Sequence, residues 1–135
     1  MSVYNVLNAG IQNKLAAGTA LTGALGGTFV YYQQAPEGAA LPYVVWNYQG
    51  GGPLNLTPSD MREMLVTVQV FAATPAQAGT IDGHVSALLH HGTIAVTGYV
   101  TCAVWRESDL ASVFNPPSGA PVYSAGAVYR VVLDS

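Results

Sequence analysis

Hydrophobic residues recur at three- and four-residue intervals in residues 3–16, with polar residues between them. The apolar positions are Val3, Val6, Leu7, Ile11 and Leu15. This period places the apolar side chains on one helix face, so it predicts an amphipathic helix with Ser2 as its N-cap. Glycines at 18, 26 and 27 limit any further helix before residue 28 to one short turn.

A second helix is predicted from Thr74 to Gly92. Thr74 suits the N-cap, Pro75 the first helical position, and Gln77 lies three residues after the cap. The helix then carries one apolar stripe. Its members are Ala78, Ile81, Val85, Leu88 and Leu89.

Alternation of apolar and polar residues predicts the strands. Residues 61–73 alternate most regularly, with Met64, Val66, Val68 and Val70 on one face. Residues 28–34, 43–49, 93–108 and 122–134 are also rich in β-branched or aromatic residues, and Gly98 suggests a bulge. Glycine and proline predict long loops after residue 49 and after residue 108.

These elements predict a single α+β domain over residues 1–135. We expect a two-layer sandwich in which a mainly antiparallel sheet of four to five strands packs two amphipathic helices on one face. The other face of such a sheet also needs cover. The prediction is that neighbouring subunits supply part of it.

Charge is the unusual feature of the composition. Charged residues make up 8% of the chain and apolar residues 50%, whereas about 25% charged residues is usual in soluble proteins. A net charge of −3 offers little electrostatic protection against association. The composition therefore favours a protein whose surface meets other protein subunits.

The same composition argues against several classes of function. The four basic residues are scattered, so they build no face for nucleic acid. The first residues lack a secretory signal pattern, and no apolar run is long enough to span a membrane. One cysteine, Cys102, excludes an intrachain disulfide. We expect a soluble protein that is cytosolic when synthesised.

Candidate chemistry is sparse. His84 and His91 lie seven residues apart near Asp82, which is wider than the helical spacing of a catalytic zinc motif, and Cys102 suits a buried, inert thiol. The charges at 60–63 suit an intersubunit salt bridge or a solvated strand start. We therefore expect no catalytic residues, no cofactor and no metal, although an enzyme using His84 or Asp60 stays open as an alternative.

The stretch YYQQAPEGAALPYVVW, residues 31–46, carries a family resemblance. Together with the preceding helix and the later VQVFA and LLHHGTIAVTGY, it resembles the tail-terminator or tail-completion proteins of long-tailed bacteriophages. The resemblance covers nearly the whole chain. The shared residues form a structural joint rather than a chemical signature; they are Ala35, Pro36, Gly38, Pro42 and Tyr43.

The resemblance implies a hexameric ring of identical subunits and no catalytic residues. Such a ring would cap the head-proximal end of the tail tube, stop tube polymerisation and join the tail to the head connector or head completion protein. DNA would pass through only as cargo, no membrane would be involved, and assembly would occur in the host cytoplasm. The alternatives are another neck or tail-tube subunit of related fold, or a small soluble enzyme.

On this reading the two long loops are the candidate contacts between subunits and rings, because their glycines allow ordering on assembly and their low charge makes burial less costly. The alternative is that both loops are solvated connections between strands and make no contact with other subunits. The candidate residues are Gly50, Gly51, Gly52, Pro53, Leu54, Asn55, Leu56, Asp60, Arg62 and Glu63 in the first loop region, and Phe114, Asn115, Pro116 and Pro117 in the second.

Overall fold

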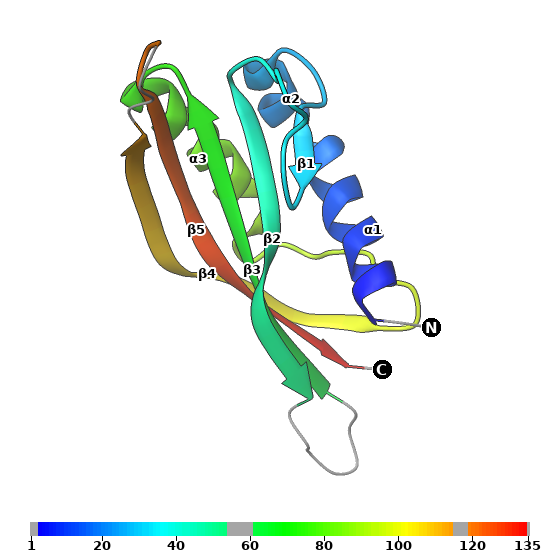
Figure 1. Cartoon of the computed structure of the whole chain (residues 1–135). Coiled ribbons are helices and arrows are strands. Elements are labelled where there is room, and N and C mark those ends of the chain that lie inside the picture. The colour runs from blue at the N-terminus through cyan, green and yellow to red at the C-terminus, as the bar shows by residue number, and fades with distance from the viewer. Residues whose placement is uncertain (1–2, 54–60, 115–118, 135) are drawn as a thin grey trace.

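The structure is a computed structural model that describes residues 3–53, 61–114 and 119–134. Within these ranges three helices and five strands follow one another (Figure 1). They are α1 (Val3–Ala16), α2 (Thr19–Leu25), β1 (Val30–Tyr32), β2 (Tyr43–Pro53), β3 (Met61–Ala72), α3 (Pro75–Leu89), β4 (Val100–Phe114) and β5 (Val122–Asp134). The predicted α+β class is confirmed.

The five strands form one sheet in the order β1-β2-β3-β5-β4. The pairings β2–β3, β3–β5 and β5–β4 are antiparallel, whereas β1 runs parallel to β2. The sheet is therefore mixed. The parallel pair arises because residues 33–42 carry the chain back along the sheet before β2 begins, so the proline-containing joint is a return connection and not a hairpin turn.

Both predicted amphipathic helices are present, and α2 is a third, short one. The Thr74 hydroxyl accepts a hydrogen bond from the Gln77 N–H at 3.2 Å, as the start signal of α3 predicts. The helix ends at Leu89 rather than Gly92, because His90 adopts an extended conformation. α2 ends at Gly26, whose φ of 80° lies in the left-handed region that favours glycine.

One core joins the helices to alternate strand residues. The even-numbered residues of β3 from Met64 to Ala72 are buried, as their alternation predicts, and they cluster with Leu7, Ile11 and Leu15 of α1 and with the apolar stripe of α3. Trp46 of β2 and Tyr129 of β5 are the largest fully buried side chains. These contacts hold the helices against one face of the sheet.

Two strand predictions need correction. Residues 93–99 are not a strand: Val96 and Tyr99 form an isolated bridge around Gly98, which has a φ of 83°. β4 begins only at Val100, and its register shifts lie between Thr101 and Ala103 and between Arg106 and Ser108 rather than at Gly98. β4 also continues through residues 109–114, where glycine and proline nearby had predicted a loop, because this stretch pairs along β5.

The remaining strand residues point to the opposite side of the sheet, here called the outer face. Strand registers place its members side by side, and Figure 1 views the sheet from this side, with α3 behind it. Among the described elements no helix covers this face. Its residues include Tyr43, Val45, Leu65, Thr67, Gln69, Phe71, Trp105, Val128, Arg130 and Val132.

Candidate assembly surface

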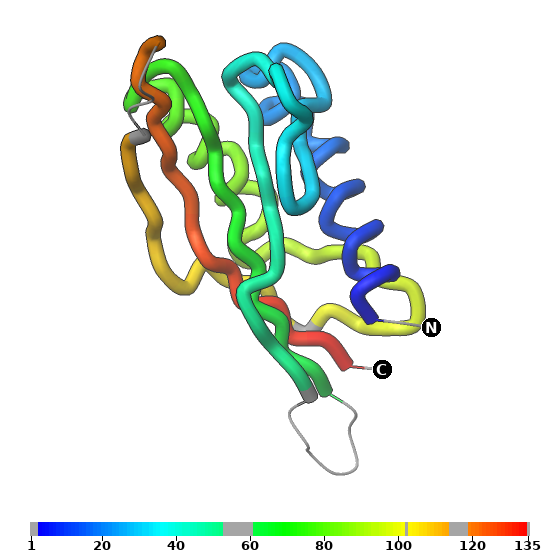
Figure 2. Tube along the Cα trace, in the orientation of Figure 1, coloured from blue at the N-terminus to red at the C-terminus, as the bar shows by residue number. Residues whose placement is uncertain are grey.

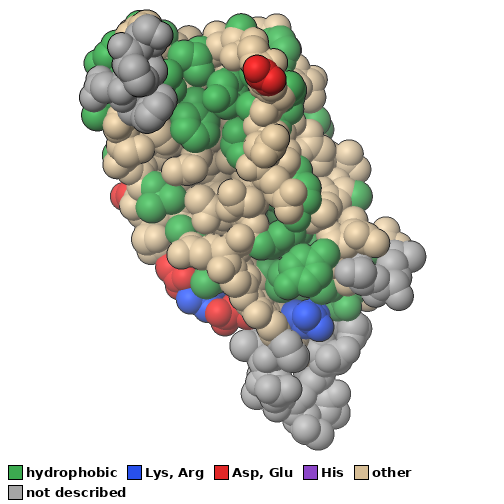
Figure 3. Space-filling model, viewed as in Figure 1, with side chains coloured by type: hydrophobic (Ala, Val, Ile, Leu, Met, Phe, Trp, Pro, Cys, Tyr) green, Lys and Arg blue, Asp and Glu red, His purple; other side chains and the backbone are tan. Residues whose placement is uncertain are grey.

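The outer face is largely apolar and uncharged. Tyr43 stacks on Phe71 with ring centroids 5.3 Å apart, and Tyr31 meets Tyr43 edge-on at 6.0 Å. Hydrophobic side chains lie among uncharged polar ones across this side of the molecule, and charged side chains are few (Figure 3). These apolar side chains are partly exposed, and apolar groups gathered on a surface in this way favour protein association.

The charges that cluster on the outer face are paired within the subunit. Arg130 of β5 donates through Nε and Nη2 to Glu107 at 2.7 Å, and its Nη1 donates to Glu63 of β3. The guanidinium also lies 5.8 Å from the centre of the Trp105 ring. Glu63, a candidate for an intersubunit salt bridge, therefore already has a partner in its own chain.

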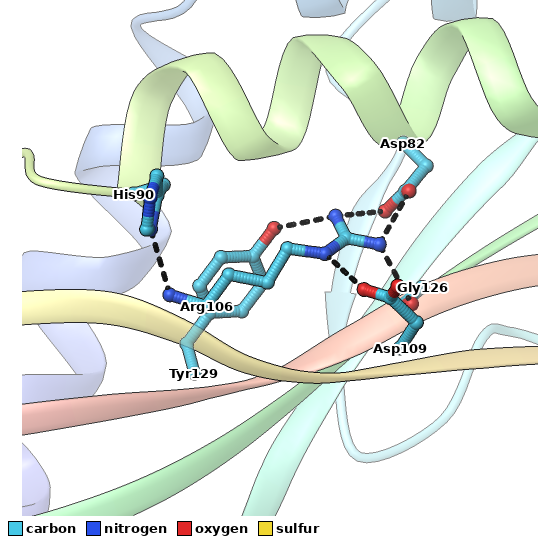
Figure 4. A network of polar contacts seen from close by, with 6 residues as sticks. All are labelled: Asp82, His90, Arg106, Asp109, Gly126 and Tyr129. Carbon is cyan, nitrogen blue, oxygen red and sulfur yellow. Dashed lines mark hydrogen bonds and ion pairs between the residues drawn. The ribbon is translucent and has the colours of Figure 1, made fainter.

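A second arginine network ties α3 to the sheet (Figure 4). Arg106 of β4 binds both carboxylate oxygens of Asp82, at 3.1 and 2.8 Å, and its Nε donates to Asp109 at 2.6 Å. The same guanidinium donates to the Tyr129 hydroxyl and to the Gly126 carbonyl. The hydrogen bonds to Asp82 raise the pKa of Arg106 further above its usual range, so it is a permanent cation.

The two networks pair many of the chain's few charged residues with one another. Arg106 and Arg130 satisfy Asp82, Asp109, Glu63 and Glu107 inside the subunit. Arg62, a predicted contact residue, has no ion-pair partner among the described residues, and its Nε is buried without a hydrogen bond. On the outer face Arg130 is shared by two glutamates, so one negative charge is left in excess, but each of these charges has a partner within the subunit, which lowers the cost of burying the face against another protein.

Two tyrosines, the buried Tyr129 and the partly buried Tyr48, make the fold sensitive to alkaline pH. Burial raises the pKa of Tyr48, helped by Tyr32 and Tyr4, and burial raises the pKa of Tyr129 against the opposing effect of Arg106. Above pH 10 the unfolded chain releases these protons while the folded chain keeps them. We expect the free energy of unfolding to be fully retained below pH 10 and to fall above it, by up to about 1.4 kcal/mol per pH unit and tyrosine.

Urea unfolding between pH 8 and 11 measures this dependence. Tyr48→Phe should reduce the slope above pH 10, although it also removes the hydrogen bond to Asn8 at every pH. An unchanged slope in both Tyr48→Phe and Tyr129→Phe would contradict the assignment to these two groups.

The structure corrects the first predicted contact loop. Gly50, Gly51, Gly52 and Pro53 belong to β2 and pair with residues 62–65 of β3 instead of opening a loop. Gly51 has a φ of 136°, and a Cβ atom there would lie 2.3 Å from the Glu63 carbonyl oxygen. The glycines thus allow a bulged, closely approaching strand next to Arg62 and Glu63.

The two predicted contact regions lie at opposite ends of the sheet. Phe114 ends β4 opposite Val122, while Pro53 pairs with Arg62 near the C-terminal end of β5 (Figure 2). The chain therefore does not bring them together in one subunit. The remaining candidates, Leu54, Asn55, Leu56, Asp60, Asn115, Pro116 and Pro117, lie outside the described residues.

The hollows of the described surface offer little chemistry. The larger is an open groove of about 530 Å³ between α1, β1 and the joint, lined by groups such as Asn8, Gln12 and Tyr31. Gln12 accepts a hydrogen bond from the Trp46 indole N–H at 2.9 Å and donates one to the Val30 carbonyl. Its amide group therefore already serves to hold α1 against the sheet. Within the described ranges there is no cluster of metal-ligating side chains and no helix able to span a membrane.

Among the described side chains, the histidines form no metal-ligating cluster. Asp82, the proposed neighbour of His84, is held by Arg106. His90, which the sequence did not single out, accepts the Arg106 backbone N–H through Nδ1 at 2.9 Å, and its ring lies against His91. The Cys102 side chain lies outside what the structure describes.

Sequence reasoning missed Arg106 and Arg130 as organising residues. In the sequence both are simply two of four scattered basic residues. The signal that could have revealed them is their place inside strands of an almost uncharged chain, Arg106 being followed by Glu107 and Asp109. A charge inside a half-buried strand needs a partner, and a chain with so few charges offers few choices.

Comparison with known proteins identifies the family. The profile described as tail completion protein gp17 matches residues 9–117. No protein in the curated collection matches. A chain solved in the virion of a native gene transfer agent particle shares the fold, with a TM-score of 0.80 and 20% identity over 99% of this chain and 98% of that chain.

A second solved chain matches with a TM-score of 0.57 and 18% identity, over 99% of this chain and 95% of that chain. At such identities the structural matches establish the fold alone, and the profile match establishes the family. The chain therefore belongs to the tail completion protein gp17 family.

Proposed function

We propose that this protein forms a closed ring of identical subunits, a hexamer, at the head-proximal end of the tail tube. The ring ends tube polymerisation and presents the surface that joins the tail to the head connector. The observation that supports this proposal is the outer face, an apolar surface that no described helix covers and whose charges are paired within the subunit. Membership of a tail completion family supports a role at the end of tail assembly.

The mechanism is geometric. A heterologous contact that repeats without closing builds a filament, whereas one that closes on itself builds a ring. A terminating ring must match the last tube ring on one side and offer a different surface on the other. The low charge of the chain also suits a channel through which DNA moves as cargo, because strong basic patches would retain the phosphates.

A matched pair of isosteric variants tests the outer face. Gln69→Glu introduces one carboxylate on this face, while Gln34→Glu introduces the same group at an exposed position of the return connection. Burial of an unpaired carboxylate costs several kcal/mol. We expect Gln69→Glu to raise the protein concentration needed for half-maximal assembly at least tenfold and Gln34→Glu to leave it unchanged.

Native mass spectrometry, with electron microscopy of tubes grown from the tail tube protein, gives the readout. The proposal expects rings, either free or on tube ends, and tubes whose growth stops. Open-ended tubes built from this protein, or binding to the portal side alone, would favour a tube or neck subunit instead. A protein that stays monomeric and ignores tail tubes would overturn the proposal.

A further inference from the structure

The sheet has one long edge strand whose two halves differ. β4 lies at the edge of the strand order. Its first half is covered by the segment after α3, because the His91 N–H donates to the Val104 carbonyl at 2.7 Å and the Arg106 N–H donates to His90. Among the described residues, nothing pairs with the same edge along residues 108–114.

The register shows which backbone groups face outward. The hydrogen-bonding backbone groups of Val104 and Arg106 point away from β5. These two residues lie opposite Val131 and Tyr129 of β5. After the bulge the same alternation continues on β5, so the backbone groups of the next alternate β4 residues also face the free edge. These residues are Asp109, Ala111 and Val113, opposite Ala127, Ala125 and Tyr123.

A second open edge lies on the other side of the sheet. β1 pairs with only three β2 residues, ending at Trp46, and thereafter residues 47–53 have no described strand on that side. The Val44 N–H and the Trp46 carbonyl face β1, so by alternation Tyr48 and Gly51 face this open edge. The open stretches 47–53 and 108–114 are equal in length.

Neither open edge is protected against pairing by free charges. Natural proteins usually blunt exposed edges with lysines, prolines or very short strands. Residues 108–114 carry only one charge, Asp109, and its carboxylate is held by Arg106. Residues 47–53 carry no charge, and Pro53, the last residue of this stretch, is the only one in it without an N–H. A long edge of this kind is suited to adding a strand from another chain.

We propose that the open β4 edge, residues 108–114, pairs with the open β2 edge, residues 47–53, of a second copy of this chain. The occupant is a second copy because the same subunit carries both edges, on opposite sides and at opposite ends of its sheet, which is the arrangement of a heterologous contact. Repetition of this contact joins the sheets of neighbouring subunits. The inference rests on the proposed ring and names the contact that builds it.

Ala111→Pro is the sharpest variant. It removes an N–H that faces the free edge, where proline is tolerated in a monomer but cannot donate to a neighbouring strand. We expect the assembly concentration to rise at least tenfold while the monomer keeps its melting temperature within about 2 °C. Ala111→Lys should weaken assembly similarly, whereas Ala20→Lys on the exposed side of α2 should not.

Hydrogen exchange of the full chain locates the contact. The backbone amides that face the open edges, those of Asp109, Ala111, Val113, Tyr48 and Gly51, should exchange at least tenfold more slowly in the ring than in the monomer. Rings that form without protection of either segment, or Ala111→Pro and Ala111→Lys proteins that both fold and assemble normally, would overturn the edge pairing and leave the ring proposal standing. A wild-type chain that never forms rings, alone or on tubes, would instead overturn the ring itself.

Discussion

Trp46→Ala should lower the free energy of unfolding by about 3–5 kcal/mol, the usual cost of removing a buried aromatic side chain. Trp46 is fully buried at the meeting of β1, β2 and α1. Its indole N–H donates to Gln12 at 2.9 Å, and its ring lies 4.6 Å from the ring of Tyr32. The substitution therefore opens a cavity and leaves Gln12 without the group that it accepts from.

Thermal and urea unfolding of dilute, unassembled protein measure this loss, which corresponds to a fall in melting temperature on the order of 10–15 °C. Trp46→Phe is the matched control. It keeps most of the apolar volume and loses the indole hydrogen bond, so a cost of about 1–2 kcal/mol is expected. A Trp46→Ala protein within 1 kcal/mol of the wild type would mean that the core is not centred on this residue.

Arg106→Ala should lower the free energy of unfolding by about 3 kcal/mol, because it leaves a largely buried carboxylate without its ion-pair partner. The Asp82 side chain is 15% exposed and receives two hydrogen bonds from this guanidinium. The change also removes donors to Asp109, Tyr129 and the Gly126 carbonyl. Arg106→Lys keeps a charge but cannot make this set of planar contacts, so about half of the loss should remain.

Arg130→Ala provides the comparison for the Arg106 prediction. Its partners Glu63 and Glu107 are 28% and 33% exposed, so water can replace the lost contacts and a cost of only about 1 kcal/mol is expected. A double-mutant cycle between Arg106 and Asp82 should give a coupling energy above about 1 kcal/mol. Equal costs for Arg106→Ala and Arg130→Ala would show that burial does not separate the two networks.

Local patterns were sufficient for α1, α3 and β3. In α1 and α3 the apolar residues repeat with the helical period, and in β3 they alternate with period two. The buried face of each element can therefore be identified from residues that are close in the sequence. The N-cap at Thr74 is equally local, since the hydroxyl and the N–H that it accepts from lie three residues apart. Such features depend on little outside the element itself.

Predictions failed where pairing outweighed composition. Residues 50–53 contain three glycines and a proline, and residues 109–114 precede two prolines, so the composition of both segments predicts loops. In the fold each has a long neighbouring strand, β3 or β5, that supplies a hydrogen-bonding partner along its length. Tertiary context overrides weak strand propensity in this way.

The sequence by itself determined the α+β class, the helical and strand periods, and the scarcity of charged residues. Its resemblance to tail-completion proteins agrees with the family match over residues 9–117. Only the tertiary structure decided the parallel β1–β2 pair, the arginine networks and the two open edges. These depend on residues brought together from distant parts of the chain, because register and ion pairing are set by three-dimensional neighbours and not by local period.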